Sequence, residues 1–254
     1  MTAVKNTQKL YDNQAEDWKR TEPTMLSDYS ARPFVLDLCG SFEGLSVLDI
    51  GCGEGYVSRE IVKRGAKNVL GIDISEKMIE RAISEKNNQG INNIEYQVQN
   101  VTDLDTKPHS NYDLVIAMFL LNYLDLTEMH NVLEKSFKVL NVGGNLVFSV
   151  PHPSLAFIKE SKFPFYFEKK GGYFSGRNIL FPGKIWRRDG ISVNVQCIHK
   201  TVEDYFECLK KAGFTLMPEV YELRVTEEHI QFDPEFFEPL RDLPLHMAFK
   251  VKKQ

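Results

Sequence analysis

The stretch Val47-Leu48-Asp49-Ile50-Gly51-Cys52-Gly53-Glu54-Gly55 decides the fold. Its first half is apolar and predicts a short buried strand, and three alternating glycines then lead into a predicted helix over residues 55–64. Glycines at such a turn let a ligand approach the backbone closely because no Cβ intervenes. In sheets of alternating strands and helices, ligands bind at the carboxyl ends of strands. The stretch therefore predicts a ligand site at residues 51–55.

The alternation of strand and helix continues on both sides of this stretch. Predicted strands cover residues 46–50, 68–73, 94–98, 112–118 and 145–150. Predicted helices cover residues 5–19, 29–39 and 55–64, then Ser75–Lys86, which Ser75 caps, and a segment that Thr127 caps and that runs to Leu140. Most of these strands are continuous apolar runs, which are typical of a parallel sheet covered by helices on both faces.

The regular alternation of strands and helices ends after residue 151. Residues 152–189 are rich in Phe, Tyr, Gly and Pro and show no helical period, and a strand-like segment, Ile191–Ile198, follows them. A helix then begins at Thr201, where Asp204 completes a capping box, and stops at Gly213. Two final strands are predicted at Phe214–Leu223 and Leu245–Val251, joined by a polar, proline-containing connection. The simplest organisation is a single domain over residues 1–254 with an insertion at residues 152–198.

Composition limits the partners. The net charge is −4 over 254 residues, which argues against nucleic acid as a partner. The four cysteines are scattered without zinc-ligand spacing, so we expect no metal site and free thiols. The polar N-terminus predicts no signal peptide, and the longest apolar run, Leu114–Leu121, is far shorter than the ~20 residues that span a bilayer. We therefore expect a cytoplasmic protein with no membrane partner.

Charge and spacing narrow the ligand. A dinucleotide loop requires G-x-G-x-x-G, but here the third glycine, Gly55, comes one residue early, and Asp49 precedes the glycines. Both departures disfavour a pyrophosphate, and therefore a nicotinamide oxidoreductase, and they favour a ligand with positive charge. Asp73 ends the next strand about twenty residues after Gly53, where an acid can accept hydrogen bonds from both ribose hydroxyls. A positively charged nucleoside fits both observations.

The ordered series VLDIGCGEG (47–55), GIDIS (71–75), QNVTDL (99–104), YDLVIAMFLLNYL (112–124) and LNVGGNLVFSV (140–150) resembles the motifs of class I methyltransferases. The resemblance covers roughly residues 8–150. It implies an α/β fold with a doubly wound, seven-stranded, mostly parallel sheet whose last strand is antiparallel. It also implies S-adenosyl-L-methionine as the cofactor, lying across the carboxyl ends of the strands.

The resemblance assigns cofactor contacts to particular positions. Gly51 and Gly53, with Cys52 between them, would face the methionine part, and Asp49 would lie near its amino group. Asp73 would hold the ribose, and Ile74 would pack on the adenine. The remaining contacts would be the adenine edge at Asn100 and Val101, the backbone carbonyl of Met118, and Tyr11, which would close over the methionine end.

One of these positions departs from the family pattern, and another could have a different role. Asn100 stands where related enzymes usually have an acid, although its amide oxygen can still accept a hydrogen bond. Tyr11 could equally be a packing residue of the N-terminal helices. We expect these helices, in residues 1–40, to cover the cofactor site.

Methyl transfer from a sulfonium needs mainly in-line positioning, although a hydroxyl acceptor also benefits from a base. The candidate bases are His152, after the fifth strand, His199, before the helix at Thr201, and Tyr123, after the fourth strand. A structural role for either histidine stays open. The other histidines show no partner spacing and are expected to be surface or packing residues: His109, His130, His229 and His246.

The insertion is expected to form a cap over the acceptor. Its aromatic side chains could line a pocket or form the cap's own small core: Phe157, Phe163, Phe165, Tyr166, Phe167, Tyr173, Phe174, Phe181 and Trp186. Basic residues are interleaved with them, and a solvated rim is the favoured interpretation over contacts with an anionic substrate or RNA: Lys169, Lys170, Arg177, Lys184, Arg187 and Arg188.

The sequence thus predicts an S-adenosylmethionine-dependent enzyme that methylates an oxygen or nitrogen of a small molecule. One alternative is a methyltransferase that modifies RNA or protein. It is disfavoured by the acidic balance and by the absence of an Asn/Asp-Pro-Pro-Tyr signature. The other alternative is a protein that binds the cofactor without catalysis, which intact glycines and Asp73 do not exclude.

Overall fold

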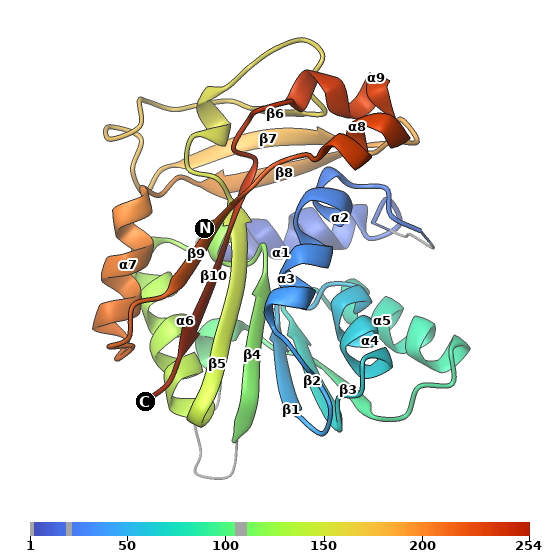
Figure 1. Ribbon diagram of the computed structural model, residues 1–254, viewed down its shortest axis with the longest axis vertical. Helices are drawn as coiled ribbons and strands as arrows, with labels where there is room; N and C mark the ends of the chain where they lie inside the picture. The colour runs from blue at the N-terminus through green and yellow to red at the C-terminus, as the bar shows by residue number, and fades with distance from the viewer. Residues whose placement is uncertain (1–2, 19–21, 105–110) are drawn as a thin grey trace.

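The computed structural model describes residues 3–18, 22–104 and 111–254 and has a seven-stranded sheet at its centre (Figure 1). The strand order is β3-β2-β1-β4-β5-β10-β9. The strands are β1 (Ser46–Ile50), β2 (Asn68–Asp73), β3 (Ile94–Val98), β4 (Tyr112–Met118), β5 (Leu140–Pro151), β9 (Glu219–Leu223) and β10 (His246–Lys252). Strands β1 to β5 run parallel, and β10 is antiparallel to both β5 and β9. The predicted fold class is confirmed.

Helices cover both faces of this sheet, as the apolar strands predict. Helices α3 (Arg32–Leu38), α4 (Tyr56–Lys63) and α5 (Glu76–Asn88) lie on one face, and α6 (Leu126–Val139) and α7 (Val202–Lys211) lie on the other (Figure 1). Successive strand residues point to opposite faces. Val47 therefore packs with the first set of helices, whereas Leu48 packs with the second.

Local capping explains where these helices begin. As predicted, the Ser75 hydroxyl accepts from the Met78 amide at 3.2 Å, and the Asp204 carboxylate accepts from the Thr201 amide at 2.8 Å. The predicted cap at Thr127 is wrong. Helix α6 starts two residues earlier because Asp125 accepts from the Glu128 amide at 2.8 Å and Glu128 accepts from the Asp125 amide at 2.9 Å. This reciprocal pair satisfies two donors at once.

Other predicted boundaries move as well. Strand β5 begins at Leu140, directly after α6, rather than at residue 145. Helix α1 spans Ala3–Gln14 rather than residues 5–19, and the amide of Gln14 pairs with the backbone of Asn194, a contact that local sequence does not contain. The predicted helix over 29–39 divides into α2 (Leu26–Ser30) and α3. Strand β9 begins after Pro218, which has no amide hydrogen to donate, rather than at residue 214.

A second, antiparallel sheet lies inside the predicted insertion and forms the cap above the carboxyl ends of the parallel strands (Figure 1). Its strands are β6 (Phe165–Phe167), β7 (Leu180–Trp186) and β8 (Ser192–Ile198). The polar connection predicted between the last two strands contributes to the cap as well. It contains α8 (Glu227–Phe232) and α9 (Pro234–Phe237), whose Ile230 and Phe237 share an apolar cluster with Phe165. The cap is therefore built from two separate segments.

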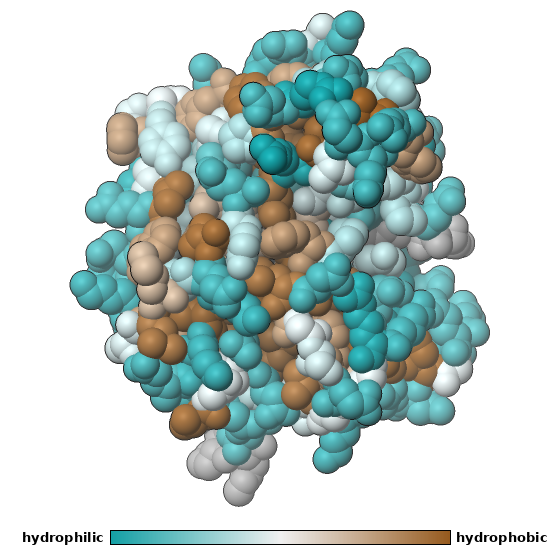
Figure 2. All heavy atoms as spheres, viewed as in Figure 1, coloured by the Kyte–Doolittle hydropathy of each residue, from teal (hydrophilic) through white to brown (hydrophobic). Residues whose placement is uncertain are grey.

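The shorter features complete the description. Four 3₁₀ turns lie at Val101–Asp103, Leu121–Tyr123, Leu155–Phe157 and Glu238–Leu240. Across the described part of the chain, no helix combines the length and apolar character needed to cross a membrane. All four cysteines are free thiols. Figure 2 shows that the upper edge of the cap on this face is mainly hydrophilic, with apolar atoms visible beneath it.

Candidate cofactor and acceptor site

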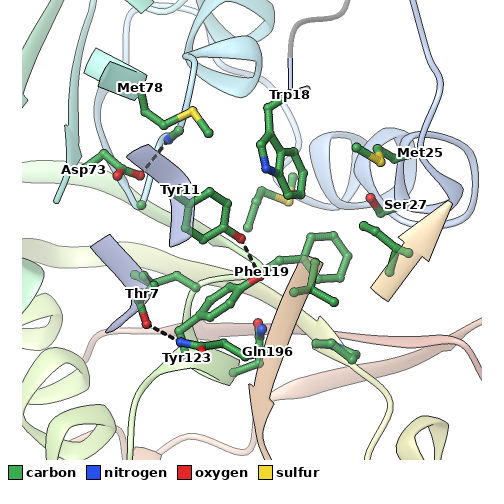
Figure 3. Close-up of a pocket in the computed structure, with 18 of the residues that line it drawn as sticks. Thr7, Tyr11, Trp18, Met25, Ser27, Asp73, Met78, Phe119, Tyr123 and Gln196 are labelled. Carbon is green, nitrogen blue, oxygen red and sulfur yellow. Dashed lines mark hydrogen bonds between the residues drawn. The ribbon is translucent and has the colours of Figure 1, made fainter. Parts of the chain in front are cut away.

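One continuous cavity lies between the carboxyl ends of the parallel strands and the cap. All ten predicted cofactor contacts line it: Tyr11, Asp49, Gly51, Cys52, Gly53, Asp73, Ile74, Asn100, Val101 and Met118. At the other end, its walls come from the cap strands and from residues 25–27 at the start of α2. Figure 3 shows side chains from these distant segments converging on the same space. The fold therefore joins the predicted cofactor crevice to the interior of the cap.

The glycine loop adopts a backbone that side chains resist. Gly51, Gly53 and Gly55 all have positive φ values, of 72°, 55° and 79°. A Cβ on Gly51 would lie 2.9 Å from Cδ1 of Leu120, which also lines the cavity. The amides of Gly51 and Cys52 donate to the Ile72 carbonyl at 2.8 and 3.0 Å, so the loop is fixed to β2. These features keep the cavity floor open at Gly51.

Asp73 is held in a fixed orientation at the end of β2. One carboxylate oxygen accepts from the Gly53 amide at 2.9 Å (Figure 3), and the other accepts from the Ser75 amide at 2.9 Å. Burial raises the pKa of this carboxyl. Each carboxylate oxygen has a second lone pair, so Asp73 can still accept hydrogen bonds from two hydroxyls of a ligand. The arrangement fits a ribose.

Asp49 is a buried carboxyl with one unused oxygen. The Ser58 hydroxyl donates to Oδ2 at 2.6 Å, whereas Oδ1 has no hydrogen-bond partner in the described part of the chain. Burial, together with the nearby charges of Asp73 and Glu54, raises the pKa of Asp49 to about 7. A cation beside Oδ1 would stabilise the ionised form. The residue therefore fits the ammonium group of S-adenosylmethionine.

Asn100 and Met118 already have partners in the protein. The Asn100 amide oxygen caps the 3₁₀ turn by accepting from the Thr102 amide at 3.0 Å, and its second lone pair remains for a ligand. The Met118 sulfur accepts from the Ser149 hydroxyl at 3.4 Å. Asn122, which follows on the same wall, is buried, and its Oδ1 has no partner among the described residues. A ligand donor in the cavity could satisfy it.

Helix α1 closes one side of the cavity through three polar contacts. The Tyr11 hydroxyl donates to the Tyr123 hydroxyl at 2.5 Å, and Gln196 of β8 donates to the Thr7 hydroxyl at 2.6 Å (Figure 3). The Gln14–Asn194 pair ties the same helix to β8. Burial raises the pKa of both phenols, that of Tyr123 to about 12. Tyr123 therefore lines the cavity as a neutral phenol, which is a poor base.

The two histidines proposed as bases do not line this cavity. The His152 ring lies 2.7 Å from the Ser154 hydroxyl and 2.9 Å from Glu222 of β9, and both ring nitrogens are engaged there. His199 donates to the Tyr173 carbonyl at 2.8 Å, and its ring stacks on Phe181. Partners outside the cavity hold both side chains, so the structure does not bring them together with the cofactor residues.

His246 was predicted to be a surface or packing residue, and this prediction is incomplete. It is the first residue of β10, is buried, and lines the cavity. Its register opposite Pro151 places it at the carboxyl end of β5. The position of His246 could have been predicted from the antiparallel direction of the last strand, because that direction brings the start of β10 to the ligand edge of the sheet. The prediction for His109 lies outside the described residues.

The cap aromatics serve both predicted purposes. Phe165, Phe167 and Trp186 line the cavity. Phe157, Tyr173 and Phe181 instead surround the His199 ring, at centroid distances of 4.9, 5.3 and 5.5 Å, and form a core of their own.

Several of the interleaved basic residues are compensated by acids. The described ion pairs are Arg177–Asp204, Arg187–Asp189, Arg188–Asp233 and Lys170–Glu168. Lys170 and Arg177 are exposed, which agrees with a solvated rim. Arg187 departs from that prediction, because it is buried and also donates to the Asp17 carbonyl at 2.6 Å. Among the described residues, no group of three His, Cys, Asp or Glu side chains could hold a metal ion.

Comparisons with known proteins agree with this geometry. Residues 47–144 match a family model described as a methyltransferase domain. The crystal structure of an S-adenosylmethionine-dependent methyltransferase from Mesorhizobium loti superposes with a TM-score of 0.65 at 25% identity, covering 87% of this chain and 96% of that one.

Two curated relatives each match a little under half of the chain. Phosphoethanolamine N-methyltransferase from Triticum aestivum is 35% identical over 122 residues, covering 48% of this chain and 24% of that enzyme. Ubiquinone biosynthesis O-methyltransferase from Bordetella avium is 32% identical over 116 residues, 46% of either chain. The chain thus matches about half or less of the length of these relatives. Residues 47–144 thus match a methyltransferase domain in sequence, and the fold of an S-adenosylmethionine-dependent methyltransferase extends over most of the chain.

Proposed function

We propose that this protein transfers the methyl group of S-adenosylmethionine to an oxygen or nitrogen atom of a small molecule enclosed beneath the cap. The observation that carries the proposal is the continuity of the cavity. The residues assigned to the cofactor line one end, the cap strands line the other, and no wall of described side chains separates them. A donor and an acceptor bound at the two ends would meet near Met118 and Phe119, where β4 ends.

The two ends of the cavity differ in chemistry. Asp49 and Asp73 make the cofactor end acidic, whereas the nearby Glu54 is paired with Arg59 at 2.8 Å. Two carboxyls suit a ligand that carries a sulfonium and an ammonium. The cap end is mainly apolar: Met25, Leu26, Leu155, Phe165, Phe167, Ile185, Trp186 and Val195. S-adenosylmethionine supplies a methyl group on an already activated sulfur. The tasks left to the protein are to hold the nucleophile in line and to exclude water, and apolar walls serve both.

An acceptor end that lies beneath the cap strands favours a small molecule over RNA or protein. The net charge of −4 and the ion-paired basic residues of the cap favour it as well. The wheat relative is named for methylation at nitrogen and the Bordetella relative for methylation at oxygen. Both atom types therefore stay in the proposal.

Calorimetry tests the cofactor end. We expect S-adenosylhomocysteine to bind the wild type with micromolar affinity and NAD to bind negligibly. Asp73→Ala should weaken binding by about 1–3 kcal/mol, the cost of losing hydrogen bonds to buried polar groups. Glu80→Ala, which removes an exposed acid from the adjacent helix α5, is the matched control and should bind like the wild type. Tighter binding of NAD, or an Asp73 variant that binds unchanged, would contradict the site assignment.

A transfer screen tests the acceptor end. Purified protein and methyl-labelled S-adenosylmethionine would be incubated with separate small-molecule, RNA and protein fractions of a cell extract. We expect label in the small-molecule fraction. Label only in RNA or protein would favour a macromolecular substrate. Intact binding of S-adenosylhomocysteine with no transfer to any fraction would favour a protein that binds the cofactor without catalysis.

A further inference from the structure

His246 occupies a distinctive place on the cavity wall. It lies at the junction of the two ends, and its ring makes a T-shaped contact with the Phe119 ring at a centroid distance of 5.0 Å. Its Nδ1 is 3.1 Å from the Ser30 hydroxyl, and Ser30 is not part of the wall. Nε2 has no hydrogen-bond partner in the described part of the chain. Because Ser30 holds the ring from behind, the edge that carries Nε2 faces the cavity.

The hydrogen-bond partners determine which ring nitrogen carries the proton. The Ser30 hydroxyl has one hydrogen, which it donates to the Leu26 carbonyl at 2.9 Å, one helical turn earlier. The same oxygen can therefore only accept from His246. Nδ1 of His246 is then the protonated nitrogen, and Nε2 keeps a free lone pair. The ring presents a hydrogen-bond acceptor to the cavity.

The surroundings keep this ring neutral. Burial, followed by the charges of Arg32 and His152, lowers the pKa of His246 to about 3. The imidazole is therefore uncharged near neutral pH. It can accept a hydrogen bond, but it is a weak base. These properties suit recognition of the acceptor better than removal of its proton.

Arg32, the nearest cation on the wall, is already compensated. Its guanidinium pairs with the buried Asp28 carboxylate at 2.7 Å, and it also contacts Ser27. Among the described lining residues, no lysine and no second arginine stands near it. An anionic group such as a phosphate would normally be held by several cationic donors. The acceptor end is therefore better suited to a neutral molecule.

We propose that Nε2 of His246 accepts a hydrogen bond from a hydroxyl or neutral amine of the methyl acceptor. The enzyme would thus select neutral, largely apolar molecules that carry such a donor. This inference rests on the proposed methyl-transfer function. It names His246 as a specificity-determining residue of the same site. An apolar molecule without the donor would leave Nε2 buried and unpaired, which is how binding sites reject such analogues.

Nitrogen NMR of histidine-labelled protein saturated with S-adenosylhomocysteine tests this directly. The probes are phenol, which carries a hydroxyl, and anisole, which has the same ring without a donor. The His246 signals are identified by their loss in His246→Gln. We expect a neutral ring with a bare Nε2, whose resonance shifts toward that of a hydrogen-bonded nitrogen when phenol is added and stays in place with anisole. A proton on Nε2, an equal response to both probes, or no response to phenol would overturn the inference.

Turnover provides a second readout once the transfer screen has identified an acceptor. His246→Phe should lower kcat/KM for that acceptor by roughly 10- to 100-fold, the loss expected when a hydrogen-bond partner is removed. His246→Gln, which keeps an acceptor oxygen, should recover part of the loss. Affinity for S-adenosylhomocysteine should stay within about threefold. His130→Gln, on α6 and outside the cavity, is the control.

The outcomes separate this inference from the proposed function. Loss of S-adenosylhomocysteine binding in the wild type, or absence of methyl transfer, would refute the proposed function itself. The other outcome is that the wild type binds and transfers normally, and that His246→Phe discriminates between acceptors as well as the wild type does. That result would refute only the role of His246.

Discussion

The buried carboxyl of Asp49 should make the ligand-free protein less stable as pH rises, and Asp49→Asn should remove this effect. Its pKa of about 7 lies well above the ordinary value of 3.8 because burial penalises the charged form. Between these two values, the native state binds more protons than the unfolded state does. Raising the pH therefore favours unfolding, with a free-energy slope set by that difference. An asparagine at this position has no proton to lose.

The magnitude follows from the pKa difference. One pKa unit corresponds to about 1.4 kcal/mol, so the penalty from Asp49 should grow by roughly 2–3 kcal/mol between pH 5 and pH 8. In the wild type, Oδ2 of Asp49 accepts from the Ser58 hydroxyl at 2.6 Å. The amide oxygen of the new asparagine can accept the same hydrogen bond. The new amide nitrogen would stand where Oδ1 has no partner, and this cost should be similar at every pH.

Urea unfolding of the ligand-free wild type and Asp49→Asn, at pH 5 and at pH 8, measures this prediction. We expect the free energy of unfolding of the variant, relative to the wild type, to rise by roughly 2–3 kcal/mol from the lower pH to the higher. Asp103→Asn changes an exposed carboxyl and is the control. A relative stability that does not change with pH would refute the reasoning.

Asp49→Asn should have the opposite effect on the ligand. The variant should bind S-adenosylhomocysteine more weakly by about 1.5–3 kcal/mol, because the ligand ammonium loses its charged partner. Calorimetry at pH 8 measures this loss, and unchanged affinity would show that Asp49 does not contact the ammonium.

Two further substitutions test the scaffold of the site by the free energy of unfolding. Gly55→Ala should cost about 2–3 kcal/mol, because φ is +79° and the new Cβ would overlap the Tyr96 hydroxyl. Gly53→Ala should cost only about 1–2 kcal/mol of backbone strain, because a Cβ at that position would have no atom within 4 Å. Equal losses would show that the Tyr96 contact does not matter. Asp28→Asn should cost roughly 3 kcal/mol, because it leaves the buried Arg32 without its paired charge. A loss below about 1 kcal/mol would mean that this charge is compensated elsewhere.

The sequence by itself determined the sheet and the cofactor end of the site. The predicted bounds of β1, β2, β3 and β4 equal those in the structure, because each strand is a short segment with an apolar or alternating pattern that is bounded by turn residues. The glycine loop and Asp73 were also predictable. Positive φ values require glycine, and a side chain at a strand end must lie at the ligand edge of a parallel sheet.

Only the tertiary structure decided the acceptor end. His246 pairs with Pro151, the last residue of β5, and His152 is the next residue of the chain, yet Glu222 holds His152 outside the cavity and Ser30 holds His246 on its wall. The cap likewise depends on α8 and α9, which come from a connection that looks merely polar. Backbone periodicity reports which face of an element is buried. The direction of one side chain depends on partners far away in the chain, and these come together only when the fold forms.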